Sequence, residues 1–231
     1  MIPLYSDASW LALDKPAGLL TTPDGRRPSL VDEARRLRPR ATHHHPLSRL
    51  DVDVTGVVLF ALTAEAVALA TRERAAGKYR RQYLGITAPP PHDSAGSWTW
   101  PIAVDRRAPT RRTTGEGDDR RDAETRFAVV AHAGPIAAVA FAPVTGRTHQ
   151  IRVHAKAAGA PLAGDGAYGG VRRVVCDDGA VLAAPRVMLH AWRLWLPGDD
   201  RSIEAPWPGD MATLWEGCGG GEFLAEARRF R

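Results

Sequence analysis

An aspartate and an arginine lie close together in the segment Ser48-Arg49-Leu50-Asp51-Val52-Asp53-Val54-Thr55-Gly56, where a loop enters an apolar run. Such a position can bury a carboxylate in part while a nearby cation keeps it ionised. A carboxylate held in this way can attack an electron-poor carbon and form a covalent intermediate. The commoner role of a lone aspartate is a turn cap or a surface ion pair, so Asp51 is at this point one candidate nucleophile with two interpretations.

A second carboxylate, Asp53, follows two residues later. We expect the side chains of Asp51 and Asp53 to face opposite sides of the chain. We therefore expect that the two do not form the acid and base pair of a glycoside hydrolase.

The segment Gly146-Arg147-Thr148-His149-Gln150-Ile151-Arg152-Val153-His154 is rich in basic and polar side chains. On a predicted helix over residues 148–158, capped by Thr148, the side chains of His149, Arg152 and Lys156 share one face. A cation near a helix N-terminus opposes the macrodipole, so helix stability does not explain Arg152. Its position favours an anionic partner, either a phosphate or a protein carboxylate. An ordinary solvated face is the alternative.

Other motifs argue against cofactors. The glycine-rich segment 159–169 lacks the Gly-Lys-Ser/Thr of a phosphate-binding loop, and no Gly-x-Gly-x-x-Gly opens a helix after a strand, so we expect a tight loop packed against the site and no nucleotide cofactor. Adjacent His43, His44 and His45 cannot all face one ion, and no metal is expected. Trp98 and Trp100 flank a polar segment and could stack on bases.

Composition indicates one globular domain. The chain has 231 residues, 44% of them hydrophobic and 25% charged, and its longest apolar stretch, residues 56–70, is too short for a membrane span and contains Glu65. No signal pattern opens the chain. Cys176 and Cys218, far apart in sequence, predict neither a disulfide framework nor a zinc cluster, so we expect a cytoplasmic protein.

The charge points to a polyanion. The formal net charge is +5, and 28 of the 31 basic residues are arginines, because Lys15, Lys78 and Lys156 are the lysines of the chain. Arginine pairs bidentately with phosphate and stacks on bases. Nucleic acid is the first candidate partner, and a codon bias toward GC-rich triplets is the alternative.

The predicted elements alternate irregularly, which favours an α+β fold with a mixed sheet. Residues 4–13 are expected to form two short extended pieces around a turn. Helices are predicted at 29–38 (capped by Ser29), 64–76 (capped by Thr63) and 148–158, strands at 52–62, 79–87, 125–131, 136–143 and 187–196, and a basic terminal helix within 222–231. Residues 105–122 are expected to be an exposed, mobile basic excursion and not a separate domain.

Taken in order, these segments resemble the RluA-type pseudouridine synthases. The matching stretches are Asp14-Lys15-Pro16-Ala17-Gly18, Arg49-Leu50-Asp51 through Thr55-Gly56, Arg81-Gln82-Tyr83-Leu84, Gly146 through His154, Pro161 through Gly169, and Leu189-His190-Ala191. The resemblance covers about residues 4–210. The nine-residue Gly146–His154 string is long and specific, and it favours the catalytic interpretation of Asp51.

The resemblance implies a single catalytic domain over residues 1–231, with a mixed, mostly antiparallel bent sheet flanked by helices and loops around a central cleft. It implies isomerisation of uridine in structured RNA (rRNA or tRNA) to pseudouridine by a monomer without metal or cofactor, the target nucleotide being flipped out of its stack. Asp51 matches the essential aspartate. Tyr83 matches the tyrosine that packs against the base and helps remove the C5 proton, and Arg152 matches the basic residue that pairs with the aspartate, Arg147 being the alternative.

Further positions of the motifs are expected to contact RNA: Lys15, Arg49, Arg147, His149 and Gln150. The chain departs from the family pattern at Ser48, where His is usual, at Val54-Thr55, where Thr-Ser is usual, and at Arg81, where Lys is usual. None of these changes removes the aspartate, but Ser48 and Val54 border it, so the fine substrate preference does not follow from the resemblance. The strand pattern begins at residue 4, so no S4-type RNA-binding domain is expected.

Two other functions remain open at this stage. A non-catalytic RNA-binding module could keep the same fold, but a pure binder does not need the trio Asp51, Tyr83 and Arg152. A hydrolase that cleaves the glycosidic bond would release free uracil, and the expected geometry of the two carboxylates disfavours it.

Overall fold

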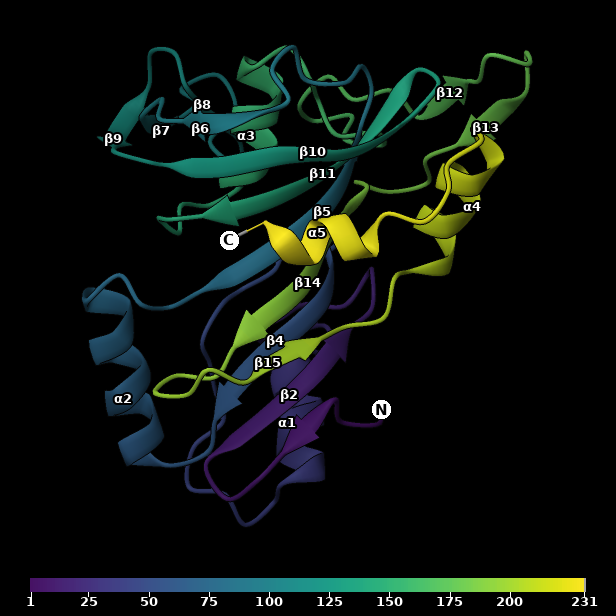
Figure 1. Ribbon diagram of the computed structural model, residues 1–231. Helices are drawn as coiled ribbons and strands as arrows, with labels where there is room; N and C mark the ends of the chain where they lie inside the picture. The colour runs from purple at the N-terminus through teal and green to yellow at the C-terminus, as the bar shows by residue number, and fades with distance from the viewer. Residues whose placement is uncertain (231) are drawn as a thin grey trace. The chain divides into compact units, whose positions relative to one another are not determined.

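The computed structural model describes residues 1–230, which fold into two compact units, each built from two segments of the chain (Figure 1). The first unit comprises Met1–Gln82 and His190–Pro206, and the second comprises Tyr83–Leu189 and the chain from Trp207 onward. Each unit has its own β-structure and its own helices. Within residues 1–230, no helix has the length and apolar character that crossing a membrane requires.

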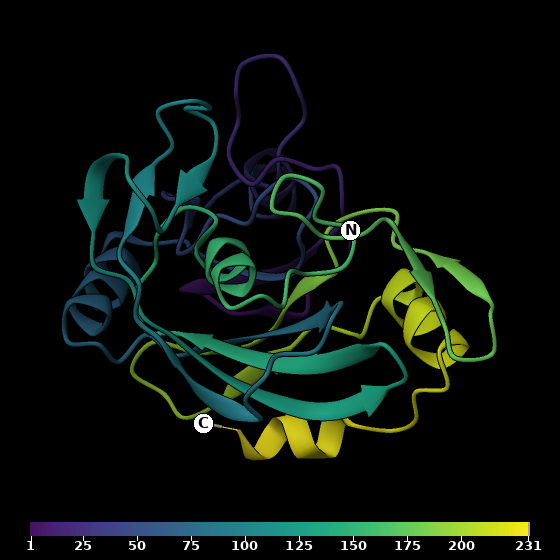
Figure 2. The ribbon, with the colours of Figure 1, turned by 90° about the horizontal axis from the view of Figure 1, so that it is seen from above.

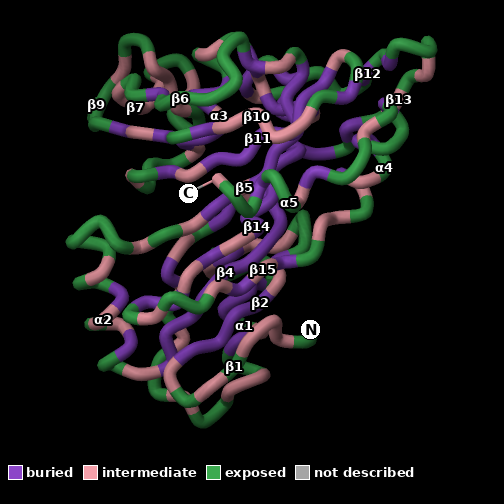
Figure 3. The backbone as a smooth tube through the Cα atoms, viewed as in Figure 1, coloured by how far each residue is buried: buried purple, intermediate pink, exposed green. Residues whose placement is uncertain are grey.

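The sheet of the first unit is organised around β4 (Thr55–Ala61), all of whose residues are buried (Figure 3). Its neighbours are β2 (Trp10–Lys15), which is antiparallel to it, and β14 (Leu189–Trp195), which is parallel to it. Short strands complete the unit: β1 (Tyr5–Ser6) pairs with β2, β3 (His45–Pro46) with β4, and β15 (Ser202–Glu204) with β14. The apolar, β-branched run of β4 suits a strand covered on both faces.

Two helices follow strands of the first unit, and both begin where the sequence predicts. α1 (Leu30–Leu37) is capped by Ser29, whose hydroxyl accepts from the backbone of Asp32 while the Asp32 carboxylate accepts from the backbone of Ser29. This reciprocal capping box satisfies two backbone donors that a helix start otherwise leaves open. α2 (Ala64–Ala75) is capped by the Thr63 hydroxyl, which accepts from Ala66 N at 3.2 Å.

The second unit contains an antiparallel array in the order β5, β11, β10, β6. The bounds are β5 (Arg81–Thr87), β11 (Ile136–Pro143), β10 (Thr125–Ala133) and β6 (Ala95–Trp98). The short helix α3 (Gln150–Ala157) lies over one face of the β10–β11 hairpin and α5 (Leu224–Arg229) over the other (Figure 2). This placement covers both faces of β11, whose residues are almost all buried.

Two smaller elements extend the second unit. β7 (Ile102–Val104) pairs with both β8 (Arg112–Thr113) and β9 (Asp118–Arg121), and the hairpin of β12 (Arg173–Val175) and β13 (Val181–Ala183) lies beside α4 (Gly209–Gly217). The strands β8 and β9 fall within residues 105–122, so the segment predicted to be a mobile excursion carries regular structure. Its side chains are largely exposed, as predicted.

The structure confirms the α+β class and the mixed, mostly antiparallel pairing. It corrects three details. The third helix begins at Gln150, because His149 adopts a left-handed conformation (φ 56°) that helical residues do not take. Trp98 is buried and stacks on Phe127 with a centroid separation of 4.3 Å, so it is a core residue and not a base-stacking platform.

The third correction concerns the cysteines. Cys176 and Cys218 form a disulfide with a Cα–Cα distance of 5.3 Å, whereas the sequence analysis expected no disulfide framework. Cys176 follows β12 and Cys218 is the C-terminal cap of α4, so the packing of that helix against the β12–β13 hairpin brings together residues 42 positions apart. Sequence separation alone carries no information about such a contact.

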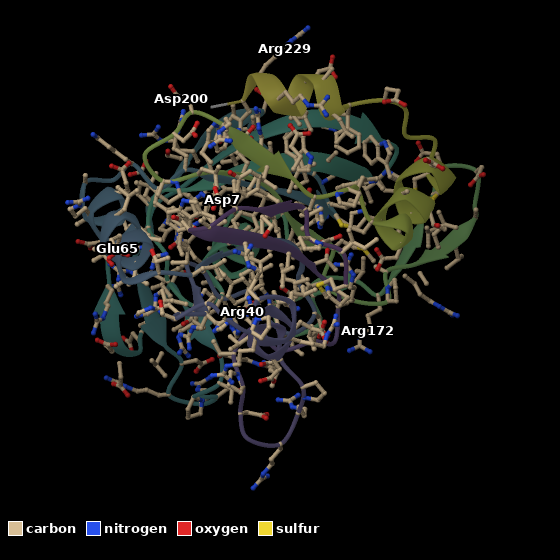
Figure 4. The ribbon with its side chains drawn as sticks, turned by 90° about the horizontal axis from the view of Figure 1, so that it is seen from below. Asp7, Arg40, Glu65, Arg172, Asp200 and Arg229 are labelled. Atoms are coloured by element: carbon tan, nitrogen blue, oxygen red, sulfur yellow. A yellow bond between two sulfur atoms is a disulfide. The ribbon has the colours of Figure 1, made fainter. Side chains whose placement is uncertain are left out.

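The capping box of α1 gives a first prediction. We expect Ser29→Ala to lower the free energy of unfolding by about 1 kcal/mol, because the substitution removes the acceptor of the Asp32 amide. Urea denaturation followed by circular dichroism measures this change. Arg40→Ala is the matched control, because Arg40 lies beyond the helix and is exposed; Figure 4 labels it. Equal stability of Ser29→Ala and the natural protein would contradict the assignment of the cap.

Candidate active site

Asp51 lies at the start of a tight turn that leads into β4. The Val54 amide donates to the Asp51 carbonyl at 3.1 Å, and residues 52 and 53 form the turn. The segment is therefore not extended, so the premise that Asp51 and Asp53 lie on an extended chain was wrong, and on such a chain residues two apart would share a face. Asp51 is half-buried and Asp53 is exposed, so the two carboxylates still occupy different environments.

The backbone on the C-terminal side of Asp51 is held by the loop that follows β2. The Lys15 ammonium donates to the carbonyl oxygens of Val52 and Pro16, each at 2.9 Å, and the Gly18 amide donates to the same Val52 carbonyl at 2.9 Å. Lys15 has no exposed surface. The environment of Lys15 therefore does not support the expected RNA contact, because its ammonium is buried and donates hydrogen bonds to backbone oxygens of Pro16 and Val52.

The backbone on the N-terminal side of Asp51 is held by Thr21. The buried Thr21 hydroxyl donates to the Leu50 carbonyl at 2.9 Å and accepts from the Leu50 amide at 3.0 Å. Both neighbours of Asp51 are thus tied to the residues after β2. Arg49, by contrast, is exposed.

A further contact fixes the point where the turn enters β4. The Thr55 hydroxyl and His190 Nδ1 lie 2.8 Å apart in the buried interior of the first unit. Next to Thr55, Gly56 has φ 116°, and a Cβ there would overlap the backbone of Ala191. The motifs Thr55-Gly56 and Leu189-His190-Ala191 therefore meet at one place, where glycine permits the close approach of β14.

In the second unit, the side chains predicted from the Gly146–His154 string gather at the start of α3. Arg152 forms a bidentate ion pair with Asp165, with Nε–Oδ2 and Nη2–Oδ1 distances of 2.7 and 2.8 Å. The Asp165 side chain is 1% exposed and the Arg152 side chain 13% exposed. The anionic partner expected for Arg152 thus includes a protein carboxylate.

Tyr168 joins this pair to its neighbours. The Arg152 guanidinium lies over the Tyr168 ring, 4.9 Å from its centroid. The Tyr168 hydroxyl is 2.7 Å from His149 Nδ1 and accepts from the Arg112 amide at 2.9 Å. Lys156 and Arg112 line a hollow with Tyr168. His149, Arg152 and Lys156 thus all lie next to this tyrosine, although His149 precedes the helix and does not belong to its face.

The side chain of Gln150 is buried and makes four hydrogen bonds within the protein. Its amide oxygen accepts from the Thr145 hydroxyl and the Arg147 amide, and its amide nitrogen donates to the Glu124 carbonyl and the Thr125 hydroxyl. Gln150 is 4% exposed. Because its hydrogen-bonding capacity is used in tying α3 to β10, the structure does not support the expected RNA contact of Gln150.

The remaining predicted residues lie on the surface of the second unit or near it. Arg147 is exposed, and its Nε donates to the Asp122 carbonyl at 2.9 Å. His149 is half-buried. Tyr83 lies on β5 opposite Phe141 of β11 and is half-buried.

Sequence reasoning missed Asp165 and Tyr168 as members of the site. Both stand in the glycine-rich segment 159–169, which was interpreted as a packing loop. The signal available was the Asp between two glycines, Gly164 and Gly166, in a segment already expected to pack against the site. Nothing in the spacing identified Arg152 as its partner.

Part of the charge of residues 105–122 is paired on the surface. Residues 105–122 contain six arginines but also five acidic residues, and Arg106–Asp118 and Arg121–Asp119 form exposed ion pairs at 2.8 and 2.9 Å. Arg229 projects from α5 and Glu65 from α2 (Figure 4).

Among residues 1–230, no group of three or more His, Cys, Asp or Glu side chains is placed to hold a metal ion. Of the three adjacent histidines, His44 contacts the Arg38 carbonyl.

Comparison with known proteins identifies the family. A family model described as RNA pseudouridylate synthase matches residues 9–157. The chain is 30% identical over 215 residues to the dual-specificity RNA pseudouridine synthase RluA of Escherichia coli K12, covering 89% of this chain and 93% of that protein. It is 34% identical over 224 residues to the ribosomal large subunit pseudouridine synthase D of Nitrosomonas europaea, covering 91% of this chain and 63% of that protein.

The fold agrees with this result. The human RNA pseudouridylate synthase domain containing 1 structure aligns with a TM-score of 0.72 at 26% identity, covering 99% of this chain and 94% of that one. The human domain containing 4 structure aligns with a TM-score of 0.74 at 22% identity, covering 94% and 92%. Fold and sequence together define an isomerase with an RNA substrate. The chain belongs to the RNA pseudouridylate synthase family, which confirms the resemblance to RluA-type enzymes.

The buried His154 of α3 predicts a pH-dependent stability. Its Nε2 lies 2.8 Å from the Trp100 carbonyl and its Nδ1 3.0 Å from the Thr125 hydroxyl, and the ring has no exposed surface. Burial lowers the pKa of His154 below its ordinary value of 6.5, and the hydrogen bond to the Trp100 carbonyl opposes that effect in part. Below about pH 6.5 the unfolded chain binds a proton that the folded chain does not, so stability falls with decreasing pH.

We therefore expect the free energy of unfolding to decrease as the pH falls from 7 to 5, and His154→Gln to make that decrease shallower. Urea titrations of both proteins at each pH measure the two slopes. An unchanged slope in the variant would show that His154 does not contribute.

Proposed function

We propose that this protein isomerises specific uridines of structured RNA, in rRNA or tRNA, to pseudouridine, with Asp51 as the nucleophile. The observation that supports this role best is the anchoring of the turn at Asp51. Lys15 and Gly18 hold Val52, Thr21 holds Leu50, and the carboxylate between them is half-buried. A reacting group on a rigid backbone loses little freedom in reaching its transition state.

The reaction exchanges one bond to the ribose for another. The bond between N1 of uracil and C1′ breaks, the uracil turns, and a bond between C5 and C1′ forms, while C5 loses a proton to solvent and N1 gains one. No oxidant, reductant or cofactor is needed, since atoms and electrons balance within the nucleoside. A carboxylate near C1′ and the base can take part by attacking the sugar, by attacking the base, or by initiating a glycal route, and the proposal covers all three.

Two further residues complete the proposed catalytic set. Arg152 is proposed to pair with the Asp51 carboxylate as its cationic partner. Tyr83 is proposed to pack against the uracil and to assist removal of the C5 proton. Both assignments come from motif positions of the family.

RNA recognition is assigned to residues whose side chains reach the surface. Arg49, Arg147 and His149 are exposed or half-buried and are proposed to contact the RNA. Lys15 and Gln150 are instead proposed to hold the Asp51 turn and the α3 segment. Flipping the target nucleotide out of its stack costs about a few kcal/mol, which arginine contacts with phosphates can offset.

The domain organisation, oligomeric state and cellular location of the protein form part of the same proposal. The two units act as one catalytic domain and the protein functions as a monomer. Residues 105–122 assist target selection through their exposed arginines. The site of action is the cytoplasm.

The direct test of this function is release of tritium from RNA labelled at C5 of uridine. We expect the natural protein to release tritium and Asp51→Asn to lose that activity by at least about a thousandfold, since the nucleophile is removed. Asp53→Asn is the matched control: the same chemical change, two residues away, on an exposed side chain, which should retain activity.

The possible results of this experiment distinguish the three candidate functions. Equal release by Asp51→Asn and the natural protein would remove Asp51 as nucleophile. Tight RNA binding without any product would favour a non-catalytic binding module, and free uracil with abasic RNA would indicate a hydrolase.

The arginine content predicts a steep salt dependence of RNA binding. We expect the logarithm of the association constant to fall linearly with the logarithm of salt concentration, because each phosphate contact releases counterions. Arg147→Ala should reduce the magnitude of that slope by about 1, the contribution of one phosphate contact. Arg201→Ala is the control, since Arg201 is bound to Asp199 and lies over Tyr5. A flat dependence measured by fluorescence anisotropy between low and high salt would refute the prediction.

A further inference from the structure

The ion pair between Arg152 and Asp165 restricts the geometry of the arginine more than neutralisation of its charge requires. Asp165 presents both carboxylate oxygens to Arg152, at 2.7 and 2.8 Å, from a side chain that is 1% exposed. A planar guanidinium bound bidentately to a fixed carboxylate is restricted in both position and rotation. The pair therefore determines where the arginine can direct its other donors.

The glycine-rich loop fixes Asp165 in turn. The Asp165 amide donates to the Leu162 carbonyl, and the Asp165 carbonyl accepts from the amides of Tyr168 and Gly170 at 2.9 and 2.8 Å. Gly170 packs so closely that a Cβ would overlap the Leu162 carbonyl oxygen. On the other side of the aspartate, Gly164 has φ 78° and its Cβ would overlap the Arg186 carbonyl oxygen. The loop thus holds the Asp165 backbone with glycines at the positions where no side chain fits.

Tyr168 supports the pair from a second direction. Its ring lies under the Arg152 guanidinium at 4.9 Å, and it is 2% exposed. Its hydroxyl is bound to His149, on the same helix start as Arg152, and to the backbone of Arg112 on β8. A single tyrosine thereby links α3, the glycine-rich loop and the β7–β8–β9 sheet.

Stability alone does not account for this arrangement. Arg152 stands in the first turn of α3, where a positive charge opposes the helix dipole. Burying an ion pair often contributes nothing to stability, because desolvation of the two charges costs as much as their attraction returns. An arrangement that is neutral in stability but restrictive in geometry is suited to orienting a functional group.

We propose that Asp165 and Tyr168 are positioning residues: they hold the Arg152 guanidinium in the orientation in which it serves the catalytic aspartate, and they act on the reaction through Arg152. This inference rests on the proposed function, in which Arg152 pairs with Asp51. It assigns a role to the glycine-rich motif, whose glycines allow a buried aspartate to reach the arginine of α3.

The test is a double-mutant cycle on the rate of tritium release at saturating RNA. Asp165→Asn should lower kcat by about tenfold or more with little change in KM, since an orienting interaction is lost and the RNA-contacting residues remain. In an Arg152→Gln background, Asp165→Asn should cause no further loss, because the residue through which it acts is already gone. The same loss of rate in both backgrounds would overturn the proposal.

A matched control exists in the same unit. Arg186 and Asp210 form an equally bidentate pair, with distances of 2.7 and 2.8 Å, and the Arg186 backbone also lies against Gly164 of the glycine-rich loop. Asp210→Asn breaks that pair in the same way, and we expect it to lower the melting temperature but leave kcat unchanged. A loss of kcat in Asp210→Asn as large as that in Asp165→Asn would show that disruption of any bidentate arginine–aspartate pair produces the effect.

A milder variant covers the case in which Asp165→Asn does not fold. Tyr168→Phe keeps the ring under Arg152 and removes the hydroxyl that contacts His149 and Arg112. We expect a smaller loss of kcat, about threefold, again only when Arg152 is present. Equal losses with and without Arg152 would contradict the assignment of Tyr168.

A readout without catalysis separates this inference from the proposed function. In ¹⁵N-labelled protein, the Arg152 Nε–H signal, identified by its loss in Arg152→Gln, should be protected from exchange because it donates to Asp165. That protection should disappear in Asp165→Asn and persist in Asp210→Asn. Persistence in Asp165→Asn would overturn the positioning role even if tritium release is normal, whereas normal protection with no release from any RNA would contradict the proposed function alone.

Discussion

A buried ion pair, Arg152 with Asp165, constrains much of the second unit. Two charges withdrawn from water must each be satisfied at short distance, or the unpaired one costs several kcal/mol. The loop from Leu162 to Gly170 holds Asp165 through backbone hydrogen bonds and closely packed glycines, and Tyr168 lies against Arg152. The first turn of α3 is set by the same requirement, since it must carry Arg152 to the carboxylate.

In the first unit, a carboxylate is held in place through the backbone on either side of it. There the carboxylate of interest, Asp51, is controlled through its backbone neighbours, which Lys15, Gly18 and Thr21 bind. The buried lysine is the less expected of these, because an ammonium group without exposure must find oxygen atoms, and it finds the carbonyls of Pro16 and Val52. The sequence motifs of the family thus correspond to the anchors of the turn as well as to the residue proposed to react.

Local interactions made part of this architecture predictable from sequence. Ser29 with Asp32, and Thr63 at the start of α2, are capping residues whose partners lie within three residues, so their helices were placed correctly. The apolar runs of β4 and β11 were likewise evident, because a strand buried on both faces has no polar alternation. β11 was predicted to its terminal residues.

The remainder depends on contacts between residues distant in sequence. The partner of Arg152 stands thirteen residues away in a loop of irregular path, and the disulfide joins residues 42 apart. Trp98 was given a surface role because tryptophan can stack on bases, and Gln150 because of its position in a family motif, yet tertiary packing buries both. The left-handed conformation of His149 shortened the third helix, and helical spacing rules do not foresee such a residue.

The account can be tested most directly by a crystal structure of the protein bound to its target RNA. It predicts a carboxylate oxygen of Asp51 within hydrogen-bond distance of the Arg152 guanidinium, about 2.7–3.2 Å, while the Nε–Nη2 edge of the arginine remains on Asp165. It also predicts the flipped uridine against that carboxylate. A complex in which Asp51 lies out of reach of both Arg152 and the uridine would contradict the account.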